Sequence, residues 1–389
     1  MDVKEKQLSF DEISLEQLRQ RRSAKWSMFG KGVLPSHYAE MDFALAPVIV
    51  KEIGAALRSG DLGYAYAPGA GLGEAFADFA RRRWSWTVDP DTVVAVPDVM
   101  VGVVELLRIV TSPGAGVVIN TPVYPPFFTV VAEAGRQVVE VPMERSTEGW
   151  RLPLDGITVA FDKGAEALLL CNPHNPTGHV ASREELLELA EVAARYDVVL
   201  LSDEVHAPLT LPGATHIPLC TMPEAEPRSI VLTSASKAWN IPGLKCAIAV
   251  AQSSAMREAL AALPVEQSER VGHLGVLASA AAFRDGEPWL DELLEYLDET
   301  RRWMPAVLAE QLPGIVYEPG EATYLAWLDC RPLGLGDDPA AHFFERGRVA
   351  LSPGTEFGSP GRGFARLNLA TSRALIEEAL SRMSKAVPT

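Results

Sequence analysis

A lysine follows two small hydroxyl residues in the segment Ser234-Ala235-Ser236-Lys237-Ala238-Trp239-Asn240-Ile241-Pro242-Gly243. The preceding residues, Ser229-Ile230-Val231-Leu232-Thr233, have the composition of a buried strand. The pattern places Lys237 where that strand ends, before a Pro-Gly turn. Burial lowers the pKa of an amine toward its neutral, nucleophilic form, so a lysine here is suited to bond to an aldehyde cofactor. A lone lysine is more often a surface residue in a loop, so further residues have to decide.

Two upstream turns carry polar side chains at the ends of further apolar runs. Asn172-Pro173-His174-Asn175-Pro176-Thr177-Gly178 follows one run, and its two prolines make the turn rigid. Asp203-Glu204-Val205-His206 follows a second run, so a carboxylate emerges at the carboxyl end of a buried strand. Ligands of open α/β sheets bind at this end of the strands. We therefore expect Asn175 and Asp203 to lie near Lys237.

These residues match the needs of pyridoxal phosphate. Its aldehyde requires a lysine, its ring nitrogen a carboxylate, and its phenolate oxygen a donor, which Lys237, Asp203 and Asn175 supply in turn. Its phosphate requires a helix N-terminus with hydroxyls or cations. The candidates for these phosphate contacts are Val99 and Met100, at the start of an apolar helical stretch, together with Ser234, Ser236 and Lys245.

The chain resembles class I and II pyridoxal-phosphate enzymes of fold type I over nearly its whole length. Within them it is most similar to the cystathionine β-lyase or cysteine-S-conjugate β-lyase branch. The resemblance rests on Met41-Asp42-Phe43, Pro122-Val123-Tyr124-Pro125-Pro126-Phe127, Cys171 to Gly178, Ser202 to His206, and Ser236-Lys237 with the Asn-Ile-Pro-Gly-Leu that follows. It implies an α/β, aspartate aminotransferase-like fold, with a mainly parallel seven-stranded sheet in the large domain and a smaller α+β domain.

The resemblance also implies roles for single residues. Lys237 would be the Schiff-base lysine, Asp203 the partner of the ring nitrogen, and Asn175 the donor to the phenolate oxygen. Tyr124 would stack on the ring, because aromatic faces attract one another in offset stacks. Arg366 would bind the substrate α-carboxylate, since its planar fork makes two parallel hydrogen bonds.

Other implied contacts extend beyond these five residues. Tyr64 would reach the phosphate of a neighbouring subunit, which implies a homodimer, and we expect Asp42 of the arm to face the substrate. Two positions depart from the family pattern. Lys245 stands where many relatives have an arginine, so it offers the phosphate a point charge rather than a fork. His206 stands where aminotransferases commonly have a tyrosine, and the sequence leaves open whether it lies near the phenolate oxygen or is a core histidine.

The pattern of elements predicts three parts of the chain. Residues 1–45 form an arm with one short helix near 15–22, which joins the small domain. Residues 46–286 form the large cofactor-binding domain, in which helix 183–196 has Ser182 as its N-cap. Residues 287–389 form the small domain, with a long helix from 288 to about 311, short strands and a closing helix. The seven strands expected in the large domain are 93–96, 117–119, 138–141, 167–171, 198–202, 230–233 and 246–251.

Composition excludes several other classes of protein. The chain has 389 residues and a formal net charge of −16, which argues against nucleic-acid backbones and anionic membranes as partners. Its four cysteines form no C-x-x-C pair, and its histidines form no helical i, i+4 pair, so we expect free thiols and no metal site. The charged N-terminus predicts no signal peptide, and no apolar run is long enough to span a membrane. Cytoplasm is the expected compartment.

Three functions remain open at this point. The first is β-elimination from an L-cysteine thioether such as cystathionine, in which Lys237 removes the α-proton and a thiol, pyruvate and ammonia result. The second is an aminotransferase, which uses the same groups and returns the proton to the cofactor. The third is a binding or regulatory protein that kept the fold and lost catalysis. Only the resemblance favours the lyase, and intact Lys237, Asp203, Asn175 and Arg366 argue against the third.

Overall fold

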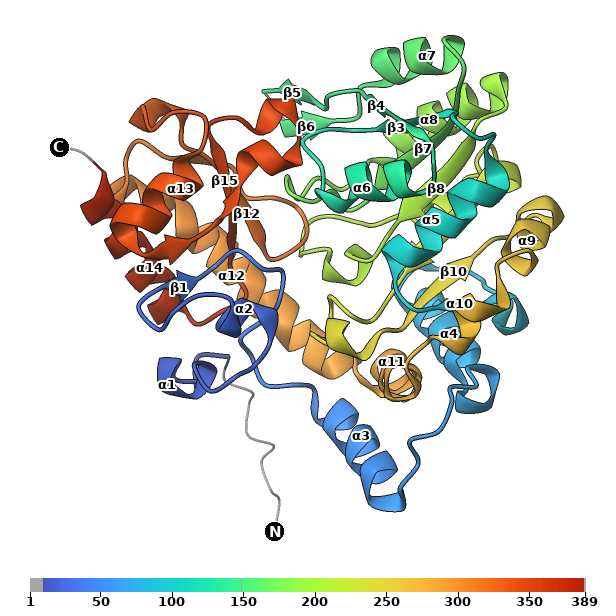
Figure 1. Cartoon of the computed structure of the whole chain (residues 1–389), viewed down its shortest axis with the longest axis horizontal. Helices are drawn as coiled ribbons and strands as arrows, with labels where there is room; N and C mark the ends of the chain where they lie inside the picture. Colours follow the sequence, from blue (N-terminus) through green and yellow to red (C-terminus); the bar gives the residue numbers. More distant parts are fainter. Residues whose placement is uncertain (1–9, 148, 388–389) are drawn as a thin grey trace.

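A seven-stranded sheet forms the centre of the larger part of the molecule (Figure 1). The computed structural model describes residues 10–147 and 149–387. The strand order is β2-β10-β9-β8-β7-β3-β4. Strand β10 runs antiparallel to both of its neighbours, and the pairs from β9 to β4 are parallel. The strands are β2 (Val94–Val96), β3 (Gly116–Ile119), β4 (Gln137–Glu140), β7 (Ala165–Cys171), β8 (Val199–Asp203), β9 (Ser229–Thr233) and β10 (Ala247–Val250).

Helices cover both faces of this sheet. Successive strand residues point to opposite faces, so each strand supplies apolar side chains to the helix layer on either side. In β7, Leu168 and Leu170 join one core cluster, whereas Leu169 and Cys171 join the other. Helices α4 (Leu72–Trp84), α7 (Leu154–Asp162), α8 (Arg183–Tyr196) and α11 (His273–Asp285) supply the first cluster. Helices α5 (Val99–Val110), α6 (Pro126–Glu133) and α9 (Ser254–Ala261) supply the second. The mainly parallel seven-stranded sheet and all seven expected strands are confirmed.

A second, antiparallel sheet lies beside the first and has its own apolar core. Its order is β11-β12-β15-β14. Helices α12 and α14 supply core residues such as Met304 and Leu380. The elements are α12 (Glu287–Gln311), β11 (Val316–Tyr317), β12 (Leu325–Asp329), α13 (Pro339–His342), β13 (Val349–Ala350), β14 (Ser352–Pro353), β15 (Phe364–Asn368) and α14 (Arg373–Ala386). The domain boundaries after residues 45 and 286 stay a prediction.

The N-terminal segment packs against this second part. Strand β1 (Leu34–Pro35) pairs in parallel with β13. The expected helix near 15–22 is shorter: α1 (Leu15–Leu18) makes one turn, because Leu18 is its only buried residue. Further short elements are α2 (Ala24–Ser27), β5 (Glu144–Ser146), β6 (Gly149–Arg151) and α10 (Val265–Glu269). Helix α3 (Pro47–Ser59) lies at the edge of the molecule, where it packs against α11 and buries Ile49 and Ala56 (Figure 1). No helix within the described ranges is both long and apolar enough to cross a membrane.

Candidate active site

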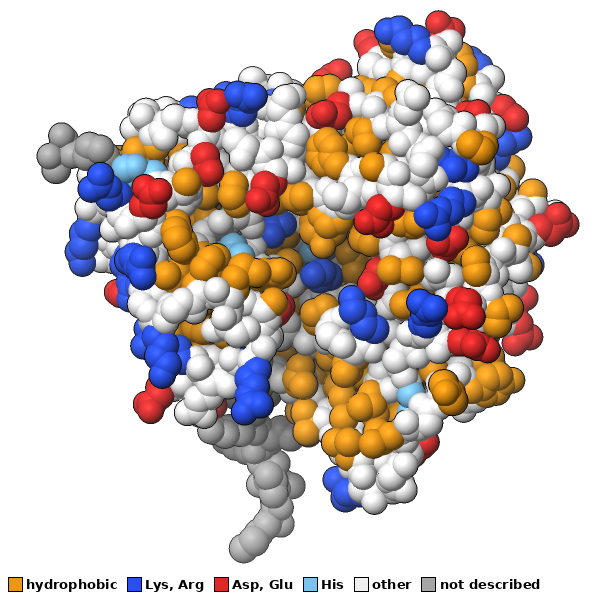
Figure 2. Space-filling model, viewed as in Figure 1, with side chains coloured by type: hydrophobic (Ala, Val, Ile, Leu, Met, Phe, Trp, Pro, Cys, Tyr) orange, Lys and Arg blue, Asp and Glu red, His pale blue; other side chains and the backbone are white. Residues whose placement is uncertain are grey.

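A cleft of about 770 Å³ opens where the N-terminal segment, the carboxyl ends of the large sheet and the second sheet meet. Figure 2 shows it as a hollow ringed by hydrophobic side chains. Lys237 follows strand β9 and lines the cleft together with Tyr124 and Arg366. Asp203 ends β8, and Asn175 lies in the turn after β7. The large sheet therefore delivers its functional side chains to one edge, as expected for parallel strands.

The Lys237 amine is prepared for nucleophilic chemistry. Nζ donates a hydrogen bond to the Ala39 carbonyl at 3.2 Å. Burial and the nearby Arg366 guanidinium lower the pKa of Lys237 to about 8, although Glu40 and Asp203 act in the opposite direction. A substantial fraction of the amine is therefore neutral near pH 8, and a neutral amine is the form that attacks an aldehyde.

Asp203 is a buried carboxylate with an incomplete set of partners. Its Oδ1 accepts from the Val205 N–H at 3.1 Å, and no ion pair of Asp203 occurs within residues 10–147 and 149–387. Burial raises the pKa of Asp203 to about 7, against the smaller opposing effect of Lys237. A cation placed against this carboxylate would lower the pKa again. The site thus fits a protonated ring nitrogen.

Arg366 and Asn175 lie in contact across the two sheets. Arg366 Nη1 donates to Asn175 Oδ1 at 3.0 Å, and Nη2 donates to the His37 carbonyl at 2.9 Å and to Ser352 Oγ at 3.0 Å. The guanidinium also lies 5.0 Å from the Phe357 ring centroid. Its buried Nε has no hydrogen-bond partner among the described residues. The arrangement holds a fixed cation with a free donor at the cleft.

Tyr124 and His206 flank these groups. Tyr124 lines the cleft, and burial raises the pKa of its hydroxyl. His206 is buried beside Tyr324, with ring centroids 6.2 Å apart. Burial and the nearby Lys237 and Arg366 lower the pKa of His206 to about 3, so its ring is neutral. Its buried Nδ1 has no partner within residues 10–147 and 149–387. The neutral ring can therefore still bond to a group placed beside it.

The expected phosphate contacts gather at the start of α5. Asp98 caps this helix by accepting from the Val101 N–H at 2.9 Å, which leaves the first N–H groups, those of Val99 and Met100, for a ligand. Lys245 Nζ lies 3.1 Å from Asp98 Oδ2, at the same helix end. A helix N-terminus next to a lysine suits a phosphate.

Ser234 and Ser236 differ in whether their hydroxyls are already hydrogen-bonded. The Ser234 hydroxyl donates to the Cys246 carbonyl at 2.6 Å and accepts from the Ser236 N–H at 3.0 Å. It is thus engaged in holding the lysine segment in shape. The Ser236 side chain is half-buried and makes no hydrogen bond within the described ranges, so of the two it has the hydroxyl available for a phosphate.

Two predicted residues lie outside the cleft. The Asp42 carboxylate is buried and bonds to Lys25 Nζ at 2.8 Å and to Trp26 Nε1 at 2.7 Å. Asp42 was predicted to face the substrate, but it does not line the cleft of this structure, and both of its oxygens bond to partners within the arm. Tyr64 projects from the surface with 94% of its side chain exposed. It does not reach the cleft of its own chain.

The sequence analysis missed the backbone segment 37–41, which runs along the cleft beside Lys237 and accepts hydrogen bonds through its carbonyls. The Ala39 carbonyl accepts from Lys237 and from the Tyr324 hydroxyl at 3.0 Å. Asn240 Nδ2 donates to the Met41 carbonyl and its Oδ1 accepts from the Met41 N–H, both at 2.8 Å. Asn240 belongs to the Asn-Ile-Pro-Gly segment, so the motif held a usable signal. The acceptors of this segment are backbone carbonyls, which leave no mark on side-chain patterns.

Comparison with known proteins identifies the family. Residues 39–383 match the model of the aminotransferase class I and II family. The chain is 37% identical to cystathionine beta-lyase of Corynebacterium glutamicum, over 95% of this chain and 98% of the relative. It is 32% identical to cystathionine beta-lyase PatB of Bacillus subtilis, over 94% and 97%.

A solved structure supports the same assignment. Cystalysin from Treponema denticola, which contains a pyridoxal 5'-phosphate cofactor, superposes with a TM-score of 0.89 at 27% identity, over 97% of this chain and 98% of that one. The cofactor that the sequence predicted is the one that cystalysin contains, and the predicted fold is the one that the two chains share. The chain therefore belongs to the aminotransferase class I and II family, as a pyridoxal-phosphate-dependent enzyme of its cystathionine beta-lyase branch.

Proposed function

We propose that the chain is a C–S β-lyase that cleaves L-cystathionine or a related L-cysteine S-conjugate. The observation that carries this proposal is the chain's place among relatives named cystathionine beta-lyase, and the joint placement of Lys237 and Arg366 on one cleft, with Asp203 buried near Lys237, supplies the groups that the reaction needs. The overall reaction consumes one water and yields a thiol, pyruvate and ammonium. The α-carbon becomes a ketone and the β-carbon becomes a methyl group, so no external oxidant or reductant is required.

Each residue has one task in this reaction. Arg366 binds the substrate α-carboxylate through its free Nε and the donors that now bond to Asn175 and Ser352. This contact orients the α-hydrogen toward Lys237. The lowered pKa of Lys237 lets its amine take that proton at neutral pH.

Pyridoxal phosphate, when bound, supplies an electron sink for the electrons that the α-carbon releases. Lys237 would hold its aldehyde, Asp203 its ring nitrogen, Asn175 and His206 the side of its phenolate oxygen, and Tyr124 one face of its ring. Asp203 would keep the ring nitrogen protonated, since a buried carboxylate strongly favours a cation beside it. Val99, Met100, Ser236 and Lys245 would hold the phosphate.

We also propose a homodimer in which Tyr64 serves the partner's site. Four large apolar or aromatic side chains at the end of α3 and in the loop after it are exposed: Leu57 by 55%, Leu62 by 57%, Tyr64 by 94% and Tyr66 by 72%. A second copy of the chain would cover this surface. Light scattering should give twice the monomer mass. Tyr64→Phe should keep the dimer and weaken cofactor binding.

One assay separates the lyase from the aminotransferase. Holoenzyme is mixed with L-cystathionine without any 2-oxo acid, and pyruvate and free thiol are followed over many turnovers. We expect equimolar, sustained release of both. One turnover that stalls until a 2-oxo acid is added would establish an aminotransferase instead, and protein that binds no cofactor would indicate a lost activity.

A further inference from the structure

The cleft above Lys237 has an apolar wall that the proposed mechanism leaves unused. Phe29 and Phe344 form its centre, with ring centroids 5.1 Å apart. Met28 and Tyr38, exposed by 52% and 39%, extend the wall on the side of the N-terminal segment, and Leu351 extends it on the side of the second sheet. Apolar side chains that gather in a cleft and stay accessible are typical of a binding surface.

The wall continues through a histidine that adds no charge. The His37 ring lies 5.0 Å from the Phe29 ring and 4.8 Å from the Tyr38 ring. Burial, Lys25 and Arg366 lower the pKa of His37 to about 4, so the ring is neutral at physiological pH. The aromatic surface from Phe344 to Tyr38 is therefore uncharged along its whole length.

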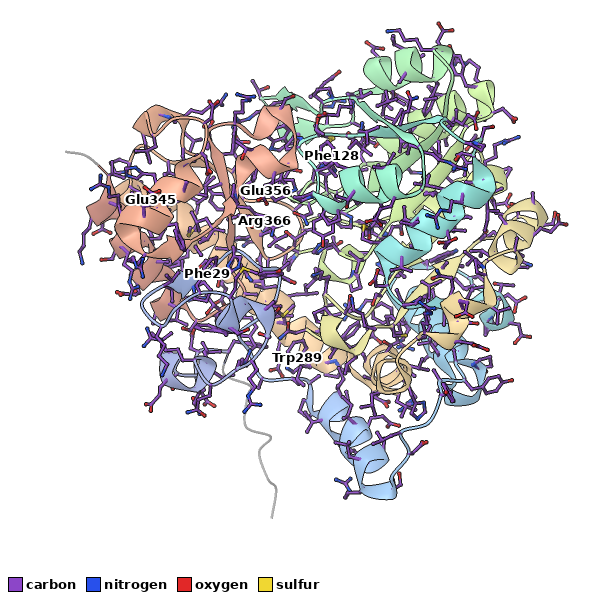
Figure 3. All side chains as sticks on the ribbon, in the orientation of Figure 1. Phe29, Phe128, Trp289, Glu345, Glu356 and Arg366 are labelled. Carbon is purple, nitrogen blue, oxygen red and sulfur yellow. The ribbon has the colours of Figure 1, made fainter. Side chains whose placement is uncertain are left out.

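Three carboxylates line the cleft beside its cations, Lys237, Lys245 and Arg366. The carboxylates are those of Glu40, Asp338 and Glu356. Figure 3 shows Glu356 next to Arg366 on the side of the second part that faces the large sheet. Glu356 makes no ion pair or side-chain hydrogen bond within residues 10–147 and 149–387.

Each lysine or arginine that lines the cleft already has an ion-pair partner or a proposed role. Lys245 pairs with Asp98, and the proposed function assigns Lys237 to the cofactor and Arg366 to the α-carboxylate. A second carboxylate on a substrate would therefore meet carboxylates and no free cation. Like charges that share one cleft cost affinity rather than add to it.

We propose that Phe29 and Phe344 form the subsite for the sulfur substituent and that Glu356 repels carboxylates there, so within the proposed substrates the enzyme prefers S-conjugates with apolar, flat substituents over those that, like L-cystathionine, carry a second carboxylate. This inference rests on the proposed C–S lyase function and specifies its substrate class. An aromatic substituent would pack on the Phe29 and Phe344 rings, and an apolar pocket discriminates by roughly 10- to 200-fold for each group it gains or loses.

The test compares two substrates that differ in their substituent. Holoenzyme is assayed for pyruvate release from S-benzyl-L-cysteine and S-(2-carboxyethyl)-L-cysteine, and the ratio of the two kcat/KM values is recorded. We expect a ratio of at least about 10 in favour of the benzyl compound. Phe29→Ala should lower this ratio about tenfold. Phe128→Ala, which truncates a half-buried phenylalanine of α6 outside the cleft lining, should leave the ratio unchanged.

A matched pair of variants tests whether the Glu356 charge repels carboxylates. Glu356→Gln keeps the shape of the side chain and removes its charge, so it should raise relative turnover of the carboxyethyl compound several-fold. Glu345→Gln removes an exposed charge on the same part of the chain, away from the cleft (Figure 3), and should change nothing. Titration calorimetry with two analogues that have no leaving group, 2-amino-5-phenylpentanoate and 2-aminopimelate, should show tighter binding of the phenyl compound. Phe29→Ala should reduce that difference, and Glu356→Gln should raise the affinity for 2-aminopimelate.

The possible failures can be told apart. A wild-type ratio near or below one, or variants that change both substrates equally, would overturn the subsite assignment while leaving the lyase intact. If neither compound nor L-cystathionine releases pyruvate over many turnovers, the proposed function itself fails. Calorimetry still tests the subsite in that case, because equal affinities for the two analogues would reject it independently of turnover.

Discussion

Arg366 Nη1 and Asn175 Oδ1 lie 3.0 Å apart and connect the second sheet to the turn after β7. The guanidinium reaches three acceptors at once, and a lysine at this position has one point charge for all of them. We predict that Arg366→Lys lowers kcat/KM about 100-fold, since a lost hydrogen bond to a charged group costs about 2 to 3 kcal/mol. Steady-state assays test this. The absorbance of bound cofactor should persist, and its loss would mean that Arg366 supports the cofactor site rather than the substrate.

Lys237 should be the lysine that holds the cofactor covalently. We predict that borohydride reduction of the holoenzyme fixes the cofactor on Lys237, which mass spectrometry of the digested protein would locate. Lys237→Ala should lower turnover by at least about 1000-fold, in the range of lost acid–base catalysis. Lys163→Ala, at an exposed lysine after α7, is the matched control and should keep both label and activity. Label on any other lysine would contradict the assignment.

The fold could be predicted from the sequence because the large sheet is buried on both faces. Its strands are then short apolar runs, and the polar residues that follow them, such as Asp203 and Lys237, mark one edge of the sheet. Helix α8 was predictable to the residue, since Ser182 and Glu185 form a capping box before an amphipathic stretch. The strand ends and the cap are both local signals.

The arm could not be predicted in the same way. Asp42 was expected at the substrate because it lies in the Met41-Asp42-Phe43 segment that carries the resemblance, but its partner Lys25 lies on a one-turn helix without a periodic pattern. The apolar wall of the cleft could not be predicted either, because Phe29 and Phe344 are brought together by the pairing of β1 with β13. Contacts between segments more than 300 residues apart depend on tertiary packing that no local pattern reports.

An ionic contact also braces the turn that carries Asn175. His179 Nε2 lies 3.2 Å from the Glu185 carboxylate, and Nδ1 lies 3.6 Å from Glu321 Oε2. Burial would lower the pKa of His179, but the bonds to Glu185 and Glu321 outweigh it and raise the pKa to about 9. Gly178 beside it has a φ of +73°, and a Cβ there would come within 2.8 Å of the Gly320 Cα. The turn and segment 320–322 thus pack in direct contact.

We predict a pH-dependent contribution of His179 to stability. Its folded pKa lies above the ordinary value of 6.5, so its contribution is complete below pH 6.5 and is lost as the pH rises through about 9. Urea unfolding at pH 6, 7.5 and 9 should show His179→Gln less stable than wild type by on the order of 2 kcal/mol at pH 6, with the difference shrinking toward pH 9. His342→Gln, at a histidine bonded to a backbone carbonyl, is the control. A difference that is constant with pH would contradict the ionic brace.

A buried network next to Asp203 should control the stability of the large sheet. Glu204 follows Asp203, and its carboxylate binds His216 Nε2, the Ser202 hydroxyl and the Leu219 N–H, each at 2.9 Å. The Glu204 and His216 side chains are 1% and 0% exposed, so solvent cannot replace a lost partner.

Removing one member leaves the others buried and unpaired, and we predict that Glu204→Ala lowers the free energy of unfolding by about 3 to 5 kcal/mol. Glu224→Ala, at an exposed glutamate nearby in sequence, should change it by no more than about 0.5 kcal/mol. Chemical unfolding of both variants measures the difference. Because Asp203 ends the same strand, the Glu204 variant should also bind the cofactor more weakly. Equal stability of the two variants would show that the network adds nothing to the fold.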